Sequence, residues 1–213
     1  MRCLLCLFVF LSGLSHGGAA LSHPHVFVDA EAGFTFDEDG RLVSLRVTWT
    51  YDAFASLMLF DILDLDKDGD GKLDDADRAI IVAGETDWPE GYEGDIHLET
   101  GAAKVALTRP ANGSSWMADD RITVAFDLPL DQPLSVAGDY VLRFYDPMYF
   151  YAYAVVAVDD SLPDGCSAEI IPFEPDDAAE ELLVQLAALS REESPEQEDV
   201  GRLFADQVWL KCA

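Results

Sequence analysis

Alternating hydrophobic and polar residues along most of the chain predict short β-strands. The alternation is clear over residues 25–36 and 42–51, and the turn-forming segment 37–40 between them indicates a hairpin. Eight later segments continue the pattern: 95–100, 104–108, 115–117, 121–127, 140–145, 149–158, 167–173 and 207–212. Turns are expected at Asn112-Gly113 and between Pro129 and Gly138. The pattern favours an antiparallel sheet or sandwich.

Four segments have helical periodicity instead. Residues 53–63 follow Asp52, a residue that caps helices well, and residues 76–83 end at Gly84, which is typical of helix ends. Residues 176–190 and 196–206 lie near the C-terminus and are separated by Pro195. Together the elements predict a single α+β domain over residues 23–213, with a helix–loop–helix insert at about 52–84.

The loop inside this insert has the spacing of an EF-hand calcium loop. Gly71 stands where such a loop needs a sharp turn, and Leu73 where an apolar residue anchors it. The oxygen ligands would come from Asp66, Asp68, Asp70, the backbone carbonyl of Lys72, Asp74 and Asp77. The sequence therefore predicts a Ca²⁺ site of the EF-hand type.

The last position of this loop departs from the pattern. Asp77 stands where a bidentate Glu is usual, and its shorter side chain predicts a weaker site or one that tolerates Mg²⁺. The alternative is an acidic, glycine-rich surface turn that binds nothing.

Residues 1–22 have the features of a signal peptide. Arg2 supplies a positive charge, residues 4–14 form an apolar run, and small residues precede cleavage after Ala20 or after Ser22. No other run is long and apolar enough to span a bilayer, so the mature chain is expected not to be embedded in a membrane. Cys166 and Cys212 remain after cleavage and predict one disulfide, with free or metal-binding thiols as the alternative.

A second candidate metal site lies at the start of the mature chain. His23 and His25 flank Pro24, and Asp29 would share a strand face with His25. Two imidazoles and a carboxylate suit Zn²⁺, Ni²⁺ or Co²⁺. Cleavage after Ser22 would add the N-terminal amine of His23, whereas cleavage after Ala20 would allow a square-planar Cu²⁺ or Ni²⁺ site. The alternative is a polar segment that leads into the first strand.

Residues 145–153 contain four tyrosines, together with Asp146 and Phe150. They could form an aromatic pocket wall with Asp146 as a ligand. The interpretation we favour is a strand–turn–strand whose tyrosines pack a sheet with their hydroxyls in water.

Several of these motifs together resemble the DUF1007 family of bacterial exported proteins. The resemblance depends on the His-Pro-His-Val-Phe-Val-Asp start, Thr48-Trp49-Thr50-Tyr51-Asp52, the calcium-like loop, Tyr145-Asp146-Pro147 and the closing segment 203–212. It implies a periplasmic component of an ABC-type transport system, associated with nickel, cobalt or zinc permeases. The family loop usually closes with Glu, from which Asp77 differs.

The sequence favours a periplasmic metal-binding accessory protein with a structural Ca²⁺ loop. The alternative is a calcium-stabilised structural or interaction module without a transition-metal role. A net charge of −28 makes nucleic acid and anionic lipid poor partners. Because the chain contains none of the common hydrolase motifs, an enzyme is not expected.

Overall fold

The computed structural model describes residues 23–89, 92, 94–135, 138–159, 161–190 and 193–212. The signal peptide expected over 1–22 lies outside these residues. The strands are β1 (Val26–Phe36), β2 (Leu42–Tyr51), β3 (Ile96–Thr100), β4 (Ala103–Lys104), β5 (Ala111–Ala118), β6 (Arg121–Leu134), β7 (Gly138–Phe144), β8 (Tyr151–Val158), β9 (Cys166–Ile171) and β10 (Gln207–Cys212). The helices are α1 (Ala53–Ile62), α2 (Asp75–Thr86), α3 (Asp177–Ala187) and the 3₁₀ turn η1 (Val200–Phe204). None of these helices is long and apolar enough to cross a membrane.

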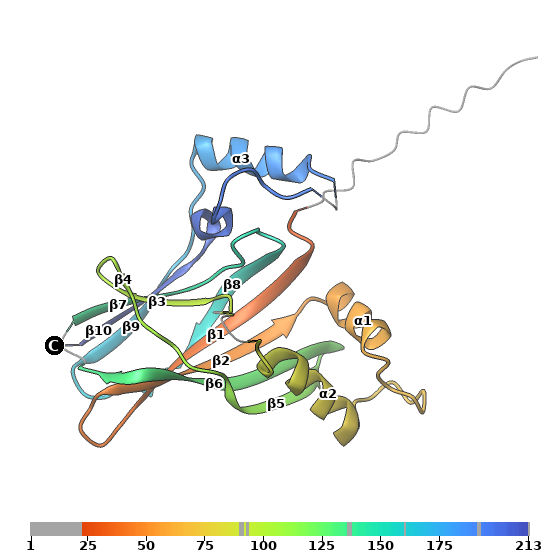
Figure 1. Ribbon diagram of the computed structural model, residues 1–213, viewed down its shortest axis with the longest axis horizontal. Coiled ribbons are helices and arrows are strands. Elements are labelled where there is room, and N and C mark those ends of the chain that lie inside the picture. The colour runs from red at the N-terminus through yellow and green to blue at the C-terminus, as the bar shows by residue number, and fades with distance from the viewer. Residues whose placement is uncertain are drawn as a thin grey trace, which may run out of the picture.

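The strands form two five-stranded sheets, which confirms the α+β class with mostly antiparallel pairing. The order is β5-β6-β2-β1-β8 in the first sheet and β4-β3-β7-β10-β9 in the second (Figure 1). All pairs are antiparallel except β1 with β8, which run parallel. One hydrophobic core includes Val47 and Phe126 of the first sheet and Leu142 and Leu210 of the second. The two sheets therefore bury their apolar faces in a shared core.

The hairpin and the first helix form as the local sequence predicts. The carboxylate of Asp37 accepts hydrogen bonds from the backbone N–H groups of Asp39 and Arg41, which closes the turn between β1 and β2. At the end of β2, Asp52 accepts from the N–H groups of Phe54 and Ala55 and caps α1.

The second helix does not end at Gly84, as its sequence predicts, but continues to Thr86. Contacts outside the helix support the extra turn, because the hydroxyl of Tyr51 on β2 donates to Glu85 over 2.6 Å. The helix also packs closely on β5, where a Cβ on Gly113 would lie 2.4 Å from a methyl of Val82. The Cβ-free backbone of Gly113 permits this approach.

Two predicted turns lie inside strands, and one predicted strand is mostly irregular. Asn112 has a φ of 53° and donates to Asp127 over 2.8 Å, so it forms a bulge within β5 rather than a turn. Strand β6 continues through Pro129 to Leu134. Of the predicted strand 104–108, only Lys104 is in a strand, β4, and Leu107 adds an isolated bridge to Leu130.

The C-terminal part contains one helix, α3, where the sequence predicts two. Only the short turn η1 forms within 196–206, and Val200 and Phe204 bury themselves against Leu186 of α3. Cys166 and Cys212 face each other across β9 and β10, and they form the predicted disulfide.

Candidate functional site

The two histidines at the start of the described chain lie against each other. The ring centroids of His23 and His25 are 4.9 Å apart, and the ring of Phe150 packs on His25 at 4.5 Å. His23 is 7% exposed, and its Nε2 lies 3.1 Å from the carbonyl oxygen of Glu193. Its Nδ1 is buried and has no hydrogen-bond partner among the described residues. The structure therefore brings two imidazoles together, and Nδ1 of His23 is a buried nitrogen without a hydrogen-bond partner among the described residues.

Asp29 does not join this pair. Its carboxylate receives a hydrogen bond from Nη1 of Arg121 over 2.7 Å, and the same guanidinium donates to the carbonyls of Thr50 and Tyr51. His25 precedes β1 and is four residues before Asp29, so the rise of about 3.3 Å per residue in extended chain separates the two side chains even if they face the same side. Asp29 instead joins β1 to the start of β6.

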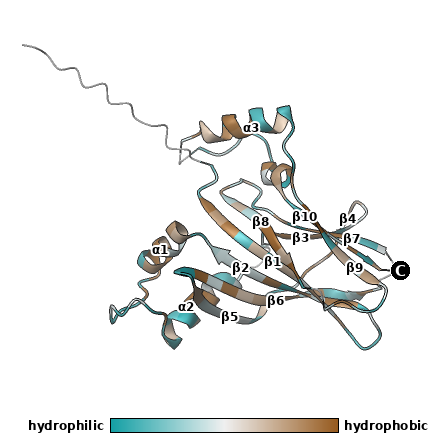
Figure 2. Ribbon diagram, turned by 180° about the vertical axis from the view of Figure 1, so that it is seen from behind, coloured by the Kyte–Doolittle hydropathy of each residue, from teal (hydrophilic) through white to brown (hydrophobic). Residues whose placement is uncertain are grey.

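The predicted calcium loop connects α1 and α2 and carries a compact acidic group. Asp66, Asp68 and Asp70 each offer a carboxylate oxygen, and these oxygens lie within 4.8 Å of one another. Asp66 accepts from the backbone N–H groups of Asp70 and Gly71 over 2.9 and 3.0 Å. The loop is coloured as strongly hydrophilic in Figure 2 and lies at the edge of the molecule, where solvent can exchange ions with it.

The other residues of the loop make contacts within the protein. Asp77 is buried and accepts from the backbone N–H groups of Asp66 and Asp74. Asp74 accepts from the N–H of Asp77 in return, which completes a capping box at the start of α2. Lys72 pairs with Asp70 over 3.1 Å, and the hydrogen bond from Lys72 lowers the pKa of Asp70. Leu73 is buried, as expected for an anchor. Calcium binding stays a prediction.

The tyrosine-rich segment forms the turn before β8 and part of that strand. The carboxylate of Asp146 accepts from the N–H groups of Met148, Phe150 and Tyr151, so it stabilises the turn. The hydroxyl of Tyr153 does not point to water but donates to Asp95 over 2.7 Å. The segment thus packs a sheet, as we favoured, and also contributes to a cavity that the sequence did not reveal.

That cavity has a volume of about 360 Å³ and lies where β2, β8 and the end of α2 meet. Its described lining residues are Trp49, Tyr51, Gly84, Glu85, Asp87, Trp88, Pro89, Tyr92, Asp95, Tyr151 and Tyr153. We call it the aromatic cavity. Alternating aromatic residues in 49–51 and 151–153 were its sequence signal, but nothing local in the sequence pairs them with Glu85 or Asp95.

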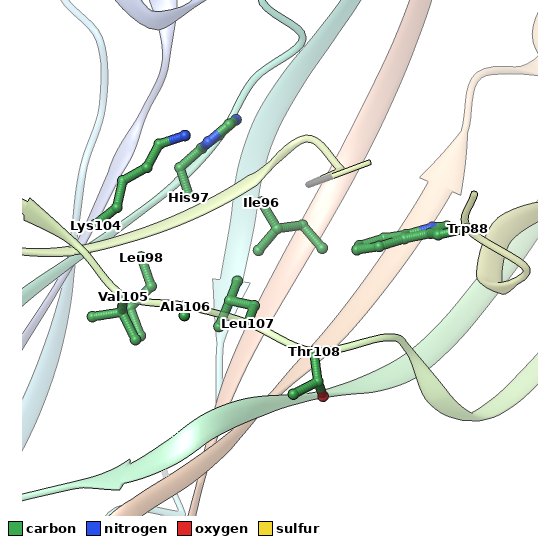
Figure 3. Close-up of a pocket in the computed structure, with 9 residues that line it drawn as sticks. All are labelled: Trp88, Ile96, His97, Leu98, Lys104, Val105, Ala106, Leu107 and Thr108. Carbon is green, nitrogen blue, oxygen red and sulfur yellow. The ribbon is translucent and has the colours of Figure 1, made fainter. Parts of the chain in front are cut away.

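A smaller cavity of about 230 Å³ shares Trp88 with the aromatic cavity and is otherwise lined by 96–98 and 104–108. Figure 3 shows Trp88 at one end of this cavity, with Ile96, Leu107 and Thr108 nearer to it than Val105 and Leu98 are. His97 and Lys104 extend from the opposite end in that view. Because its wall is mainly aliphatic, this cavity has few polar groups that could bind or react with a ligand.

Comparison with known proteins identifies the class of this chain. The family described as "Protein of unknown function (DUF1007)" matches residues 5–212, and the chain belongs to it. An uncharacterised protein of Haemophilus influenzae is 24% identical over 213 residues, which cover 96% of this chain and 98% of the relative. The "Uncharacterized 15.5 kDa protein in trpE 3'region" of Spirochaeta aurantia is 30% identical over 89 residues, 42% of this chain and 64% of the relative.

Proposed function

We propose that this protein is a periplasmic accessory protein that binds a divalent transition metal and passes it to a membrane permease. The main support is the pair formed by His23 and His25, whose rings lie 4.9 Å apart at the expected start of the mature chain. Neutral imidazole nitrogen is a preferred ligand of Zn²⁺, Ni²⁺ and Co²⁺. No catalytic step is part of the proposal.

A further ligand, the N-terminal amine of His23, would be created by signal-peptide cleavage. Cleavage after Ser22 makes His23 the first residue, so its own amine and imidazole can chelate one ion while His25 adds a second imidazole. Pro24 has no amide proton, and this excludes a site built from successive deprotonated amides. Asp29 is not needed in this arrangement, because Arg121 already pairs with it.

A titration of the mature protein tests this proposal. The N-terminus is first established by mass spectrometry, and Zn²⁺, Ni²⁺, Co²⁺ and Ca²⁺ are then titrated separately. We expect His23→Ala and His25→Ala each to weaken transition-metal binding at least about tenfold, because each removes a ligand. His97→Gln is the matched control, since His97 stacks on Tyr145 away from the pair. Equal affinity in the wild type and His23→Ala would contradict the proposal.

A second candidate function is a calcium-stabilised structural module. It is favoured by the three carboxylates of Asp66, Asp68 and Asp70, which already lie within 4.8 Å of one another. In this case only Ca²⁺ binds, Asp66→Ala abolishes binding, and the histidine variants behave as wild type. The same titration series therefore separates the two candidates.

The family resemblance is the reason for proposing a permease as the partner. A separate experiment tests this interaction. Cross-linking of the mature protein in intact cells, followed by mass spectrometry, should recover a polytopic metal permease. Recovery of soluble proteins alone would remove the transporter from the proposal while leaving metal binding intact.

A further inference from the structure

We propose that the aromatic cavity binds an organic ammonium ion, that is, an alkylated amine such as a quaternary ammonium compound. This site is separate from the histidine pair and from the acidic loop, and it does not depend on the metal-binding proposal.

The walls of the cavity are aromatic rings held in place by the first sheet. Tyr51 on β2 and Tyr153 on β8 are both paired with Val28 of β1, so their side chains project from the same face of the sheet. The ring centroids of Trp49 and Tyr153 are 5.4 Å apart, and those of Tyr151 and Tyr153 are 6.2 Å apart. Rings in contact with one another form a continuous aromatic wall, and the exposed face of such a wall attracts a cation through the ring quadrupoles, most strongly where water is excluded.

The charged groups of the cavity are all acidic. Glu85, Asp87 and Asp95 are its ionisable carboxyl groups, and its described lining residues include no Lys, Arg, His, Asn or Gln. Tyr51 donates to Glu85 over 2.6 Å and Tyr153 donates to Asp95 over 2.7 Å. Each tyrosine has only one proton to donate, so both carboxylates keep acceptor positions for a ligand.

Glu85 and Asp95 hold their protons more tightly than usual here. Burial raises the pKa of Glu85, and burial together with the charges of Asp146 and Glu85 raises the pKa of Asp95 to about 7. A bound cation would favour the ionised forms and recover part of this cost. Cation binding in this cavity is therefore expected to be coupled to ionisation of these two carboxyl groups.

The arrangement suits a diffuse organic cation better than a metal ion. Among the described residues, only Asp66, Asp68 and Asp70 approach closely enough to form a three-ligand metal group, and the cavity carboxylates do not. Aromatic faces and separated carboxylates match the spread charge of an alkylated ammonium group.

The decisive experiment compares choline with its uncharged isostere 3,3-dimethyl-1-butanol on the wild-type protein. Binding is followed by isothermal titration calorimetry and by tryptophan fluorescence at pH 8, where Asp95 is mostly ionised. We expect choline and tetramethylammonium to bind and change the fluorescence, and the neutral isostere to bind at least tenfold more weakly. Equal binding of the two isosteres, no binding of any ammonium compound, or preferential binding of glucose or Ca²⁺ would each overturn the proposal.

Variants then assign the binding to the cavity. Asp95→Asn and Glu85→Gln should each weaken choline binding at least tenfold, whereas Asp68→Asn in the acidic loop and His23→Ala should leave it unchanged. Circular dichroism and the thermal midpoint of each variant confirm that it is folded. If a folded Asp95→Asn variant binds choline with wild-type affinity, the cavity is not the site.

Discussion

Two acidic regions lie at opposite ends of α2 and differ in almost every physical respect. The loop at the start of the helix presents Asp66, Asp68 and Asp70 toward solvent, and nearby backbone N–H groups satisfy them. At the other end, Glu85 and Asp95 line the aromatic cavity, and each accepts from a tyrosine. Carboxylates in water stay ionised and bind hard cations, whereas sequestered carboxylates resist ionisation. The same residue types therefore have different physical properties in the two regions.

The two regions also differ in how far apart in the sequence their hydrogen-bonded groups are. In the loop, Asp66 binds backbone groups four and five residues away. In the cavity, Tyr51 is 34 residues from Glu85 and Tyr153 is 58 residues from Asp95. The loop can form once its flanking helices form, but the cavity exists only when β2, β8 and α2 have assembled.

The two regions should differ most in how much a substitution lowers the stability of the fold. Trp88 is buried, donates from Nε1 to the carbonyl of Glu85 over 2.8 Å and packs against Phe126. Trp88→Ala should lower the free energy of unfolding by about 3–5 kcal/mol, measured by urea denaturation. Asp68→Ala in metal-free buffer should change it by less than about 0.5 kcal/mol. A loss below about 1 kcal/mol for Trp88→Ala would show that the cavity wall is not part of the cooperative core.

Between pH 4 and 8, the pH dependence of stability should come from the cavity and not from the loop. The pKa of Asp95 is about 7 in the folded protein against 3.8 in a model compound, so the unfolded chain ionises first as the pH rises. This contribution is fully present below about pH 4 and is lost as the pH rises through 7, by at most about 1.4 kcal/mol per pH unit. Denaturation midpoints between pH 4 and 8 measure it.

Asp95→Asn is the control for this pH dependence and should flatten the profile over the same range. The groups that face Asp95 are Tyr153 from β8, Glu85 from α2 and Asp146 from the turn before β8. The neighbouring cavity that Asp95 also lines adds His97, Lys104, Asp199 and Arg202. A profile that keeps its slope in Asp95→Asn would assign the effect to one of these groups.

The capping role of Asp77 gives a smaller effect that separates structure from metal binding. Asp77→Ala removes the acceptor for the N–H groups of Asp66 and Asp74 and should cost about 1–2 kcal/mol without any metal. Thermal unfolding in the presence of a chelator measures this cost. Asp75→Ala is the matched control, because that side chain is fully exposed and its ion-pair partner among the described residues is Arg78. Equal costs for the two variants would remove the structural role assigned to Asp77.

The smallest effect is the calcium response of the loop. If its dissociation constant is about 1 mM, as in extracellular calcium modules, 10 mM Ca²⁺ should stabilise the protein by about 1.4 kcal/mol. Differential scanning calorimetry with and without Ca²⁺ measures the shift. Asp70→Asn should abolish it, and Glu85→Gln should retain it. A calcium response that depends on Glu85 and not on Asp70 would reverse the comparison between the two regions.

Local features of the structure followed from local features of the sequence. The hairpin of β1 and β2, the cap at Asp52 and the acidic loop each depend on residues a few positions apart, and each lies where the pattern predicts it. The predictions failed where distant contacts override local preference. Gly84 does not end α2, Asn112 and Pro129 lie inside strands, and residues 196–206 form only the turn η1.

The sequence alone determined the α+β class, the disulfide between Cys166 and Cys212 and the spacing of the acidic loop. The tertiary structure decided that Asp29 pairs with Arg121 rather than with the histidines, and that β1 and β8 run parallel. It also assembled the aromatic cavity from β2, α2 and β8. Periodicity and capping act over one or two turns of chain and can be recognised in a sequence. The position of a side chain in a cavity depends on which strands pair, and this is set by the packing of the whole core.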